Sequence, residues 1–373
     1  MQTTGRDLSL YFHIPFCKKK CPYCHFYNIY YKTDLEKKYL KAIKIHLNDL
    51  KNILQKSNIV SIYFGGGTPS LLSVNTIEDI LNIVNPKSNI EITIEINPED
   101  FSKEKIKALK ALNVNRASVG VQSFDDNLLK ILQRRHSAKK AKEVILDIYK
   151  CGIENISIDL MYDVIGQDIL SFQKTLDEVN LLDITHISLY NLTFEKGTLF
   201  YKNRKILEKE VPKETLSLEL LNLATSSFEK LGFKRYEISA FAKKGFESFH
   251  NLGYWQARDF LGFGPSAFSY FGEKRFQNVC NLQKYIEALD SKKTVVDFEE
   301  KLKYPHNINE LLAIHLRIVN GIDIIEFEKK NGSIPTKTLK KLKNSEFIAF
   351  DKNHIRLNEK GLLFYDTLAS ELI

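Results

Sequence analysis

The sequence carries three closely spaced cysteines near its N-terminus, in the segment FCKKKCPYCHFYN at 16–28. Cys17, Cys21 and Cys24 are three of the chain's five cysteines. Structural zinc sites take four ligands, usually in two separated pairs, and disulfide frameworks take an even number of cysteines. Thiolates are also the usual ligands of iron–sulfur clusters. Three thiolates can hold three irons of a cubane cluster and leave the fourth iron open to a small chelating ligand.

A zinc site of the Cys3His type is the main alternative for these thiols, with His25 as the fourth ligand. His25 directly follows Cys24. Adjacent residues point their side chains in different directions, so the imidazole would have difficulty facing the same metal, and we favour the cluster. The remaining cysteines, Cys151 and Cys280, stand alone in the sequence and are expected to be ordinary buried or half-buried thiols.

The elements that must position these cysteines follow a regular order. Short β-branched runs alternate with helix-like stretches as far as residue 191. The candidate strands are 8–14, 59–64, 90–96, 116–121, 155–161 and 186–191. The candidate helices between them are 33–56, 74–84, 102–112, 125–150 and 168–180. This alternation is typical of a parallel sheet or barrel, and six units are two short of a full TIM barrel. We therefore expect an α/β fold with a partial (β/α)6 TIM-like barrel.

Beyond the barrel the sequence indicates a different organisation. A long helix at 213–231 precedes a stretch at 246–275 that is rich in aromatic residues and glycine and that we expect to be irregular. Three helices, a hairpin and a last helix follow, at 307–318, 322–330, 336–344, 347–357 and 358–372. This order resembles a winged-helix module. We predict a barrel core over 1–235, an extension over 236–300 and a small winged-helix-like C-terminal domain over 301–373.

Residues suited to chemistry stand where the predicted parallel strands end, which is where such folds place their sites. The cysteines follow the first strand, and GGGTPS at 65–70 follows the second. Glu95, Gln122 and Asp159 lie at the ends of the next three strands. The glycine-rich turn alone could be a tight connection, and it matches neither nucleotide-binding fingerprint. Taken together, these groups indicate one site at one edge of the sheet.

The motifs and their order resemble the radical S-adenosylmethionine (SAM) superfamily. Within it, the chain is similar to oxygen-independent coproporphyrinogen III oxidases and to their relatives, the haem chaperones of the HemW group. The similarity runs nearly from end to end. It includes YFHIPFCKKKCPYC, GGGTPSLL, EINPE, GVQSF, IDLMY, HISLYNLTFEKGT and HNLGYW. The resemblance implies a partial radical SAM barrel.

The resemblance also assigns cofactor sites to individual residues. It implies a [4Fe–4S] cluster on Cys17, Cys21 and Cys24, with the amino and carboxylate groups of SAM on the open iron. It assigns SAM contacts to Tyr11, Gly66, Gly67, Thr68, Glu95, Gln122, Arg134 and Asp159. These types suit SAM, because glycine permits close backbone approach, carboxylates suit an ammonium and hydroxyls, and arginine suits a carboxylate. Tyr23, between the second and third cysteines, is expected to pack against the adenine.

The two subgroups of the family differ at positions that can be read in this chain. The oxidases have a fourth cysteine two residues after the third, where this chain has Phe26. HNLGYW resembles the haem-chaperone signature H-N-x-x-Y-W, which implies haem contacts by His250, Tyr254 and Trp255. Histidine and tyrosine are both known haem ligands, and tryptophan can stack on a macrocycle. The alternative is a packed aromatic corner in which His250 is hydrogen-bonded in place.

The chain departs from the family pattern at several positions. Asp163 and Ile165 stand where relatives have glycine and proline, so the loop below the SAM site is expected to differ. Phe268 stands where a histidine is frequent, which removes one candidate haem ligand. His25 stands where relatives often have aspartate.

The resemblance implies a haem chaperone that binds haem and transfers it to an acceptor protein, such as a membrane-associated respiratory haem protein. A radical SAM oxidase that decarboxylates porphyrinogen propionates is the first alternative, and such activity is not expected here. A nucleic-acid binder that uses the winged-helix-like domain is the second. Against it, PTKTLKKLKN at 335–344 is too short and too rich in lysine alone to look like a recognition helix.

Composition and charge indicate a cytoplasmic protein. The net charge of +8 comes from 54 basic and 46 acidic residues, and the lysines are spread along the chain, as on a solvated surface. Neither a signal peptide nor an apolar run near the roughly 18 residues of a membrane span is evident. An odd number of cysteines argues against secretion. We expect no membrane span and no nucleic-acid partner.

Overall fold

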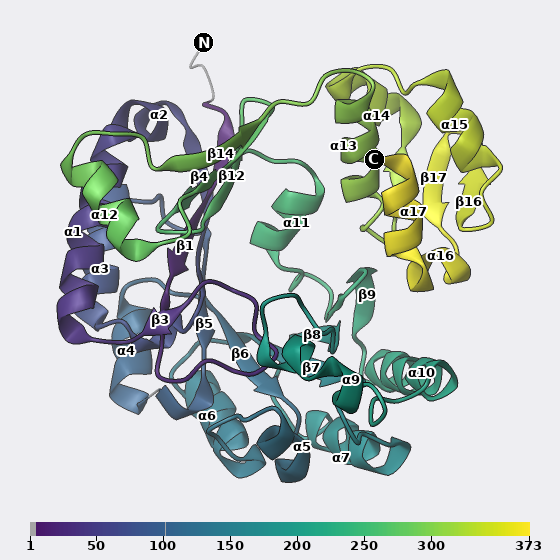
Figure 1. The fold of residues 1–373 in the computed structure, drawn as a ribbon, viewed down its shortest axis with the longest axis horizontal. Coiled ribbons are helices and arrows are strands. Elements are labelled where there is room, and N and C mark those ends of the chain that lie inside the picture. Colours follow the sequence, from purple (N-terminus) through teal and green to yellow (C-terminus); the bar gives the residue numbers. More distant parts are fainter. Residues whose placement is uncertain (1–4, 101) are drawn as a thin grey trace.

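The computed structural model describes residues 5–100 and 102–373. Its main feature is a twelve-stranded sheet in which six neighbouring strands run parallel in chain order. These six are β1 (Asp7–Ile14), β4 (Asn58–Gly66), β5 (Glu91–Ile96), β6 (Arg116–Gln122), β7 (Asn155–Tyr162) and β8 (His186–Asn191). They match the six predicted strands, and the expected partial α/β barrel is confirmed (Figure 1).

Helices follow the strands as expected, with two differences. The first part of the chain contains α1 (Thr33–Asp49), α2 (Lys51–Lys56), α3 (Val74–Val84), α4 (Lys103–Ala111), α5 (Asp126–Ile131), α6 (Ala138–Lys150), α7 (Ile169–Val179), α8 (Leu199–Lys202), α9 (Arg204–Leu207) and α10 (Glu214–Lys230). The predicted helix 33–56 is interrupted at Leu50. The predicted helix 125–150 is two helices, because Gln133 takes a left-handed φ of +53° after α5 and the Ser137 side chain caps a new N-terminus for α6.

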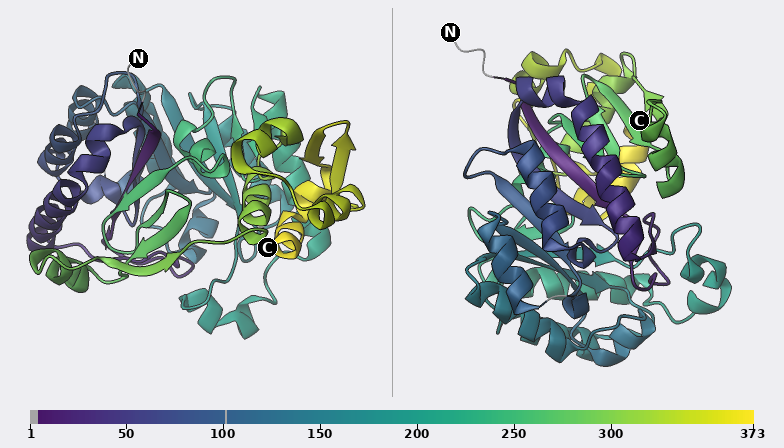
Figure 2. Two further views of the ribbon diagram at one scale, coloured as in Figure 1. Left: turned by 90° about the horizontal axis from the view of Figure 1, so that it is seen from above. Right: turned by 90° about the vertical axis from the view of Figure 1, so that its left-hand side faces the viewer.

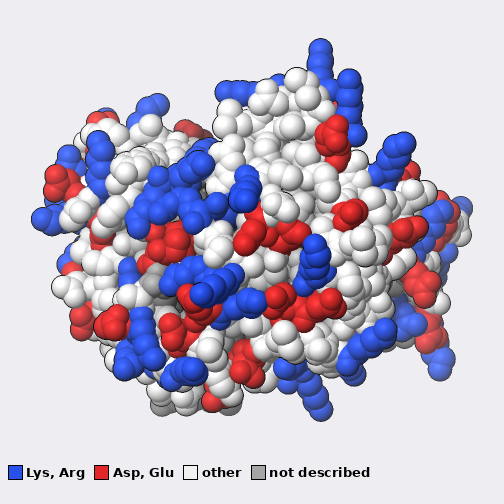
Figure 3. All heavy atoms as spheres, turned by 90° about the horizontal axis from the view of Figure 1, so that it is seen from below, with Lys and Arg blue, Asp and Glu red and all other residues white. Residues whose placement is uncertain are grey.

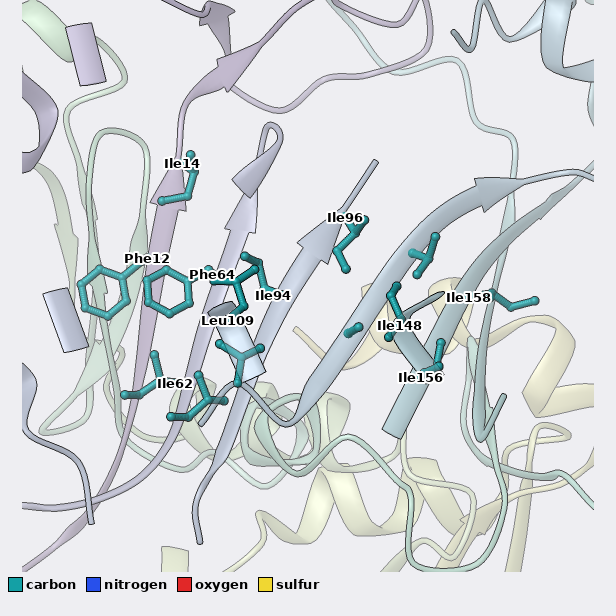
Figure 4. Packing of buried hydrophobic residues seen from close by; sticks show 14 of the residues in the cluster. Phe12, Ile14, Ile62, Phe64, Ile94, Ile96, Leu109, Ile148, Ile156 and Ile158 are labelled. Atoms are coloured by element: carbon teal, nitrogen blue, oxygen red, sulfur yellow. The ribbon is translucent and has the colours of Figure 1, made fainter. Parts of the chain in front are cut away.

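Apolar and polar side chains alternate along the parallel strands. On β1, Leu8, Leu10, Phe12 and Ile14 are buried in the main hydrophobic core. Figure 4 shows Phe12 beside Phe64 of the neighbouring strand, and their ring centroids lie 5.1 Å apart. The same view places side chains from the helices, Leu109 and Ile148, among those of the strands. One face of the sheet therefore forms the core against the helices.

The opposite face of the same strands is polar. Tyr11 of β1 lies beside Tyr63 of β4, and Glu95 of β5 lies beside Ser118 of β6. Deeper along this face, Arg116 is only 1% exposed, and its Nε lies 4.0 Å from Glu91 Oε2. The sheet thus directs its polar side chains into the barrel interior and its apolar side chains outward to the helices.

The extension is ordered rather than irregular, contrary to the expectation for 246–275. It contains β9 (Lys234–Glu237), β10 (Ala240–Ala242), α11 (Phe249–Trp255), β11 (Phe260–Phe263), β12 (Phe268–Phe271), β13 (Lys274–Asn278), α12 (Leu282–Asp290) and β14 (Val296–Glu300). Strand β11 pairs with β1, and β12 to β14 continue the sheet beyond it. Cross-strand pairing that the local sequence does not reveal is the reason for the difference.

The C-terminal segment has a hydrophobic core of its own, which includes Leu312, Phe327 and Ile355. Its elements are α13 (His306–His315), β15 (Ile322–Asp323), α14 (Ile324–Asn331), α15 (Thr336–Lys343), β16 (Ile348–Asp351), β17 (His354–Leu357), α16 (Glu359–Leu363) and α17 (Tyr365–Leu372). Figures 1 and 2 show this segment at one side of the barrel. Helix α11 contacts both β4 of the barrel and α13 of this segment.

Candidate functional site

The three clustered cysteines lie in a loop that follows the C-terminal end of β1. The short parallel strands β2 (Phe16–Cys17) and β3 (Ile29–Tyr30) join the two ends of this loop. Each sulfur has a different polar neighbour. Cys17 Sγ lies 3.4 Å from Thr68 Oγ1, Cys21 Sγ lies 3.6 Å from Arg134 Nη1, and Cys24 Sγ lies 3.9 Å from Asn28 Nδ2. The thiols are therefore held by contacts from three separate parts of the fold.

The chemistry of these thiols fits an iron–sulfur cluster. Burial raises the pKa of the Cys17 thiol to about 11 and also raises the pKa of Cys24. Both thiols hold their protons at neutral pH, so iron must displace them on binding. Among the described residues, no group of three His, Cys, Asp or Glu side chains is arranged to hold one metal ion. A cubane cluster takes each thiolate at a different iron, so the sulfurs need not converge on one point.

The glycine-rich turn after β4 packs directly against the cysteine loop. Gly66 has a φ of +111°, and a Cβ atom there would lie 2.6 Å from the His13 ring. A Cβ atom at Gly67 would lie 2.7 Å from the carbonyl oxygen of Phe16 and 3.1 Å from Cys17 Sγ. Only glycine fits this backbone and these contacts. A larger residue at Gly66 would disrupt the turn itself.

A buried hydrogen-bond network connects the cysteine loop to β5 and to the turn between α5 and α6. Arg134 Nη2 donates to Asn97 Oδ1 at 2.6 Å and to the Gly120 carbonyl at 2.9 Å. Asn97 Nδ2 in turn donates to Thr68 Oγ1 at 2.9 Å. The Nε of Arg134 is buried with no partner among the described residues. Asn97 was missed in the sequence, although it lies inside the quoted motif EINPE.

Two carboxylates lie at the mouth of the barrel. Glu95 accepts hydrogen bonds from the Tyr63 hydroxyl and the Gly66 N–H, both at 3.0 Å. Asp159 accepts one from Ser118 Oγ at 3.4 Å. Burial, with a contribution from Asp159, raises the pKa of Glu95 to about 7. Burial also raises the pKa of Asp159 to about 6. A cation that enters this mouth would be stabilised by both groups.

The other predicted SAM contacts lie around the same mouth. The Tyr11 hydroxyl lies 3.1 Å from His13 Nδ1. Gln122 ends β6 with a φ of +67°, the left-handed conformation that changes the direction of the chain there. Tyr23 packs against Phe200, with ring centroids 6.3 Å apart, and burial raises the pKa of its hydroxyl. Its ring therefore belongs to a small apolar cluster beside the cysteine loop.

Known proteins match this chain over nearly its whole length. The model of the radical SAM superfamily matches residues 11–179. Heme chaperone HemW of Bacillus subtilis is 33% identical over 95% of this chain and 96% of its own length. The chain belongs to the HemW family of radical SAM proteins. A relative from Danio rerio, radical S-adenosyl methionine domain-containing protein 1, is 30% identical over 98% of this chain and 87% of its own length.

A solved structure has the same fold. Coproporphyrinogen III oxidase HemN of Escherichia coli superimposes with a TM-score of 0.86 and covers 99% of this chain and 90% of its own. Its sequence identity is 23%, so the likeness concerns the fold alone. The family uses a [4Fe–4S] cluster and SAM, and the buried thiols and carboxylates described above are of the types that these cofactors need.

A large cavity in this HemW-family protein opens beside the cysteine loop. Its volume is about 900 Å³, which is within the usual range for small-molecule sites. Segments from the loop, from α11, from the extension and from α13 form its wall. The aromatic side chains in this wall are Tyr11, Phe26, Tyr27, Tyr254, Trp255, Phe260, Phe268 and Tyr270. The cavity thus combines a broad aromatic surface with charged side chains, which are Lys20, Lys196, Arg258, Arg275 and Glu310.

Of the residues predicted to contact haem, Tyr254 and Trp255 line this cavity, and His250 does not. His250 is fully buried, with Nδ1 2.8 Å from Ser61 Oγ and Nε2 2.8 Å from the Tyr254 hydroxyl. Burial lowers its pKa to about 3, so the ring is neutral. Ser61 donates its own proton to Ser9, so Nδ1–H donates to Ser61 and Nε2 accepts from Tyr254.

His250 therefore has no free nitrogen for a metal. The structure shows the hydrogen-bonded corner that was the alternative for HNLGYW, and His250 is not placed as a haem ligand. Trp255 has one face covered, because the Arg317 guanidinium lies 4.3 Å from its ring centroid. The motif forms α11, so His250 and Tyr254 share a face one turn apart, as the sequence indicated.

Two other histidines line the cavity. His13 uses both ring nitrogens, because Nε2 lies 2.9 Å from the Tyr27 carbonyl and Nδ1 accepts from Tyr11. His25 is exposed and stacks on Phe26, with ring centroids 4.5 Å apart. Neither nitrogen of His25 is hydrogen-bonded to a described residue. In the sequence, His25 was considered only as a zinc ligand, because the rest of this cavity comes from distant segments such as α11 and α13.

The departures from the family pattern are accommodated locally. Asp163 has a φ of +58°, a conformation that glycine adopts readily and aspartate tolerates. Its buried carboxylate accepts hydrogen bonds from Asn191 and Ser217. Ile165 is buried in the same apolar cluster as Leu132. These contacts keep the loop after β7 in place.

The surface gives two further observations. Lysine and arginine are interspersed with aspartate and glutamate over the face seen from below (Figure 3). Within the described ranges, no helix has the length and the apolar character that crossing a membrane requires.

Proposed function

We propose that this protein binds haem in the cavity beside the cysteine loop and transfers it to an acceptor protein. The observation that carries this proposal is the cavity of about 900 Å³ with its aromatic wall, to which α11 of the HNLGYW motif contributes Tyr254 and Trp255. An aromatic wall suits a flat apolar macrocycle. The name of the Bacillus subtilis relative, heme chaperone HemW, supports the same function.

We further propose that Cys17, Cys21 and Cys24 hold a [4Fe–4S] cluster, with SAM at the barrel mouth. When bound, the cluster and SAM supply one-electron chemistry. Glu95 and Asp159 would neutralise the positive charge of SAM. Arg134 would hold the Cys21 thiolate and orient Thr68 through Asn97. Tyr11, Tyr23, Gly66, Gly67 and Gln122 would form the remaining wall of the SAM site.

We assign the haem contacts to side chains that line the cavity and whose binding atoms are not already hydrogen-bonded within the protein. Tyr254, Trp255 and Phe268 line the cavity and would pack on the macrocycle. His25 lines the cavity with a free imidazole, so we propose it as the ligand of the haem iron. His250 would act indirectly, because it fixes the hydroxyl of Tyr254.

The acceptor would be a respiratory haem protein at the membrane, to which this protein delivers haem from the cytoplasm. Delivery requires haem to leave the site without the protein unfolding. A cavity between the barrel and α13, with an exposed histidine at its edge, is suited to such release, because the iron ligand belongs to a loop and not to the core.

Titration with haem tests this function. The anaerobically reconstituted full-length protein is titrated with haem, and the Soret band is followed. We expect about one haem per chain and transfer to an apo-haem-protein in excess. A parallel incubation with coproporphyrinogen III, SAM and a reductant should give no decarboxylated product, because Phe26 occupies the position of the oxidases' fourth cysteine. Decarboxylation without stable haem binding would establish the oxidase instead.

A further inference from the structure

A single arginine in the cavity wall holds two carboxylates that come from different elements. Arg275 lies on β13, directly opposite Glu300 of β14. Its Nε donates to Glu300 Oε2 at 2.7 Å, and its Nη1 donates to Glu310 of α13. One positive charge therefore faces two negative charges, and this group has more carboxylates than it needs for neutrality.

The ion pair between Arg275 and Glu310 separates two spaces. Tyr270, Arg275, Glu310 and Leu311 line both the large cavity and a second pocket of about 100 Å³. The second pocket also contains Lys330 and Asn307. The Asn307 Oδ1 atom is buried without a partner among the described residues. A polar space with a second cation, Lys330, thus adjoins Glu310. Glu273 also lines this space, and its carboxylate is paired with Lys301.

The two glutamates are not held equally. Glu300 meets two nitrogens of the guanidinium, whereas Glu310 meets one. The Glu310 side chain is 13% exposed, compared with 35% for Glu300. Burial raises the pKa of Glu310, and so does the neighbouring Glu300. Glu310 is therefore the partner that is displaced more easily.

We propose that Arg275 receives a carboxylate of the ligand that occupies the large cavity, and that this carboxylate displaces Glu310 from the guanidinium. The inference rests on the proposed function, because haem combines a flat apolar body with two propionate carboxylates. Its body would lie against the aromatic wall, and one propionate would reach Arg275. Glu310 would move toward Lys330 in the second pocket. Arg275 thereby selects an apolar ligand that carries an acid group.

The experiment compares haem with haem dimethyl ester, which has the same ring and iron but no carboxylates. Both are titrated into the full-length protein and three variants, Arg275→Gln, Glu310→Gln and Glu299→Gln. Glu299 pairs with Lys274 on the same two strands, at 2.7 Å, and neither residue lines the cavity, which makes it the matched control. Thermal melting confirms that each variant is folded.

Arg275→Gln should weaken haem binding by about tenfold, because a charge-assisted hydrogen bond is lost, and should change ester binding by less than about threefold. Glu310→Gln should tighten haem binding, because a competing carboxylate is gone, and should leave ester binding unchanged. Glu299→Gln should alter neither. If Arg275→Gln does not fold, the proposal is tested by Glu310→Gln alone, through its affinities for haem and for the ester.

Two kinds of failure can be told apart. If the unchanged protein binds neither haem nor its ester, the proposed haem-binding function is refuted. If it binds both, but Arg275→Gln and Glu310→Gln affect haem and ester alike, haem binding stands and the role of Arg275 in recognising a carboxylate is overturned.

Discussion

The Nε2 atom of His250 lies 2.8 Å from the hydroxyl oxygen of Tyr254, one turn further along α11. His250 is neutral and donates its only N–H to Ser61. Its Nε2 therefore accepts a hydrogen bond from the hydroxyl of Tyr254. The hydroxyl of Tyr254 is thus fixed toward the barrel while the residue lines the cavity. Tyr254 thus connects the buried interior of the barrel, through His250, with the wall of the cavity.

Replacement of Tyr254 by phenylalanine should destabilise the apoprotein. The substitution keeps the ring but leaves Nε2 of the fully buried His250 without a donor. A buried group that loses its only partner costs about 1–3 kcal/mol. The free energy of unfolding, measured by urea denaturation at neutral pH, should fall by this amount. An unchanged value would show that His250 finds another partner. Tyr304→Phe, at an exposed tyrosine, is the control.

Replacement of His25 by alanine should shift or weaken the Soret band of the haem complex. His25 lines the cavity with a free imidazole, whereas both nitrogens of His250 are occupied in the core. His250→Ala should therefore lower stability and leave the position of the Soret band nearly unchanged, provided that the protein is folded. The absorption spectra of the two variants at equal haem loading make the comparison. The reverse pattern would restore His250 as the iron ligand.

The sequence predicted the positions of the parallel strands well, because short apolar runs that contain β-branched residues alternate there with helix-like stretches. Glu95 and Asp159 could be assigned to one edge of the sheet from the direction of parallel strands alone. Arg134 was assigned from the family resemblance, but the break between α5 and α6 that positions it was missed. The left-handed conformation of Gln133 and the capping side chain of Ser137 create this break in an otherwise helical pattern.

The cavity could not be predicted from the sequence in the same way. Its wall combines the cysteine loop, α11, β12 and α13, and only tertiary packing brings these segments together. HNLGYW indicated a site of interest, yet the pattern could not show that His250 faces the core. A histidine and a tyrosine four residues apart can bond to each other as readily as to a ligand. Hydrogen bonds to residues far away in the sequence, such as the one between His250 and Ser61, decide whether the histidine faces the core or a ligand.

Loss of any one of Cys17, Cys21 and Cys24 should abolish the iron–sulfur cluster, because each thiolate would hold a different iron. Their replacement by alanine should remove the brown chromophore after anaerobic reconstitution, measured by absorption and by iron and sulfide content. Cys280→Ala is the informative control, because Cys280 is exposed and lines the large cavity near the loop. If Cys280→Ala also lost the cluster, the ligand assignment would be wrong. Cys151→Ala should keep it.

Glu95 should make the apoprotein less stable as the pH rises. Its pKa is about 7 in the folded protein, compared with an ordinary value of 4.5, so the folded state binds more protons between these values. The free energy of unfolding should therefore fall as the pH rises through this window and level off above it. The full shift corresponds to about 3 kcal/mol, which is an upper bound because the group lies at the barrel mouth.

Glu95→Gln should remove much of this pH dependence, because glutamine has no proton to release in the window. Urea denaturation of the metal-free protein at pH values between about 5 and 8 measures the slope for each variant. Glu143→Gln, at an exposed carboxylate on α6, should reproduce the slope of the unchanged protein. Asp159 contributes to the raised pKa of Glu95, so Asp159→Asn should shift the fall in stability to lower pH. Asp159, with a pKa of about 6, should keep a smaller slope at the lower end of this range. An undiminished slope above about pH 6 in Glu95→Gln would place the titrating group elsewhere in the barrel.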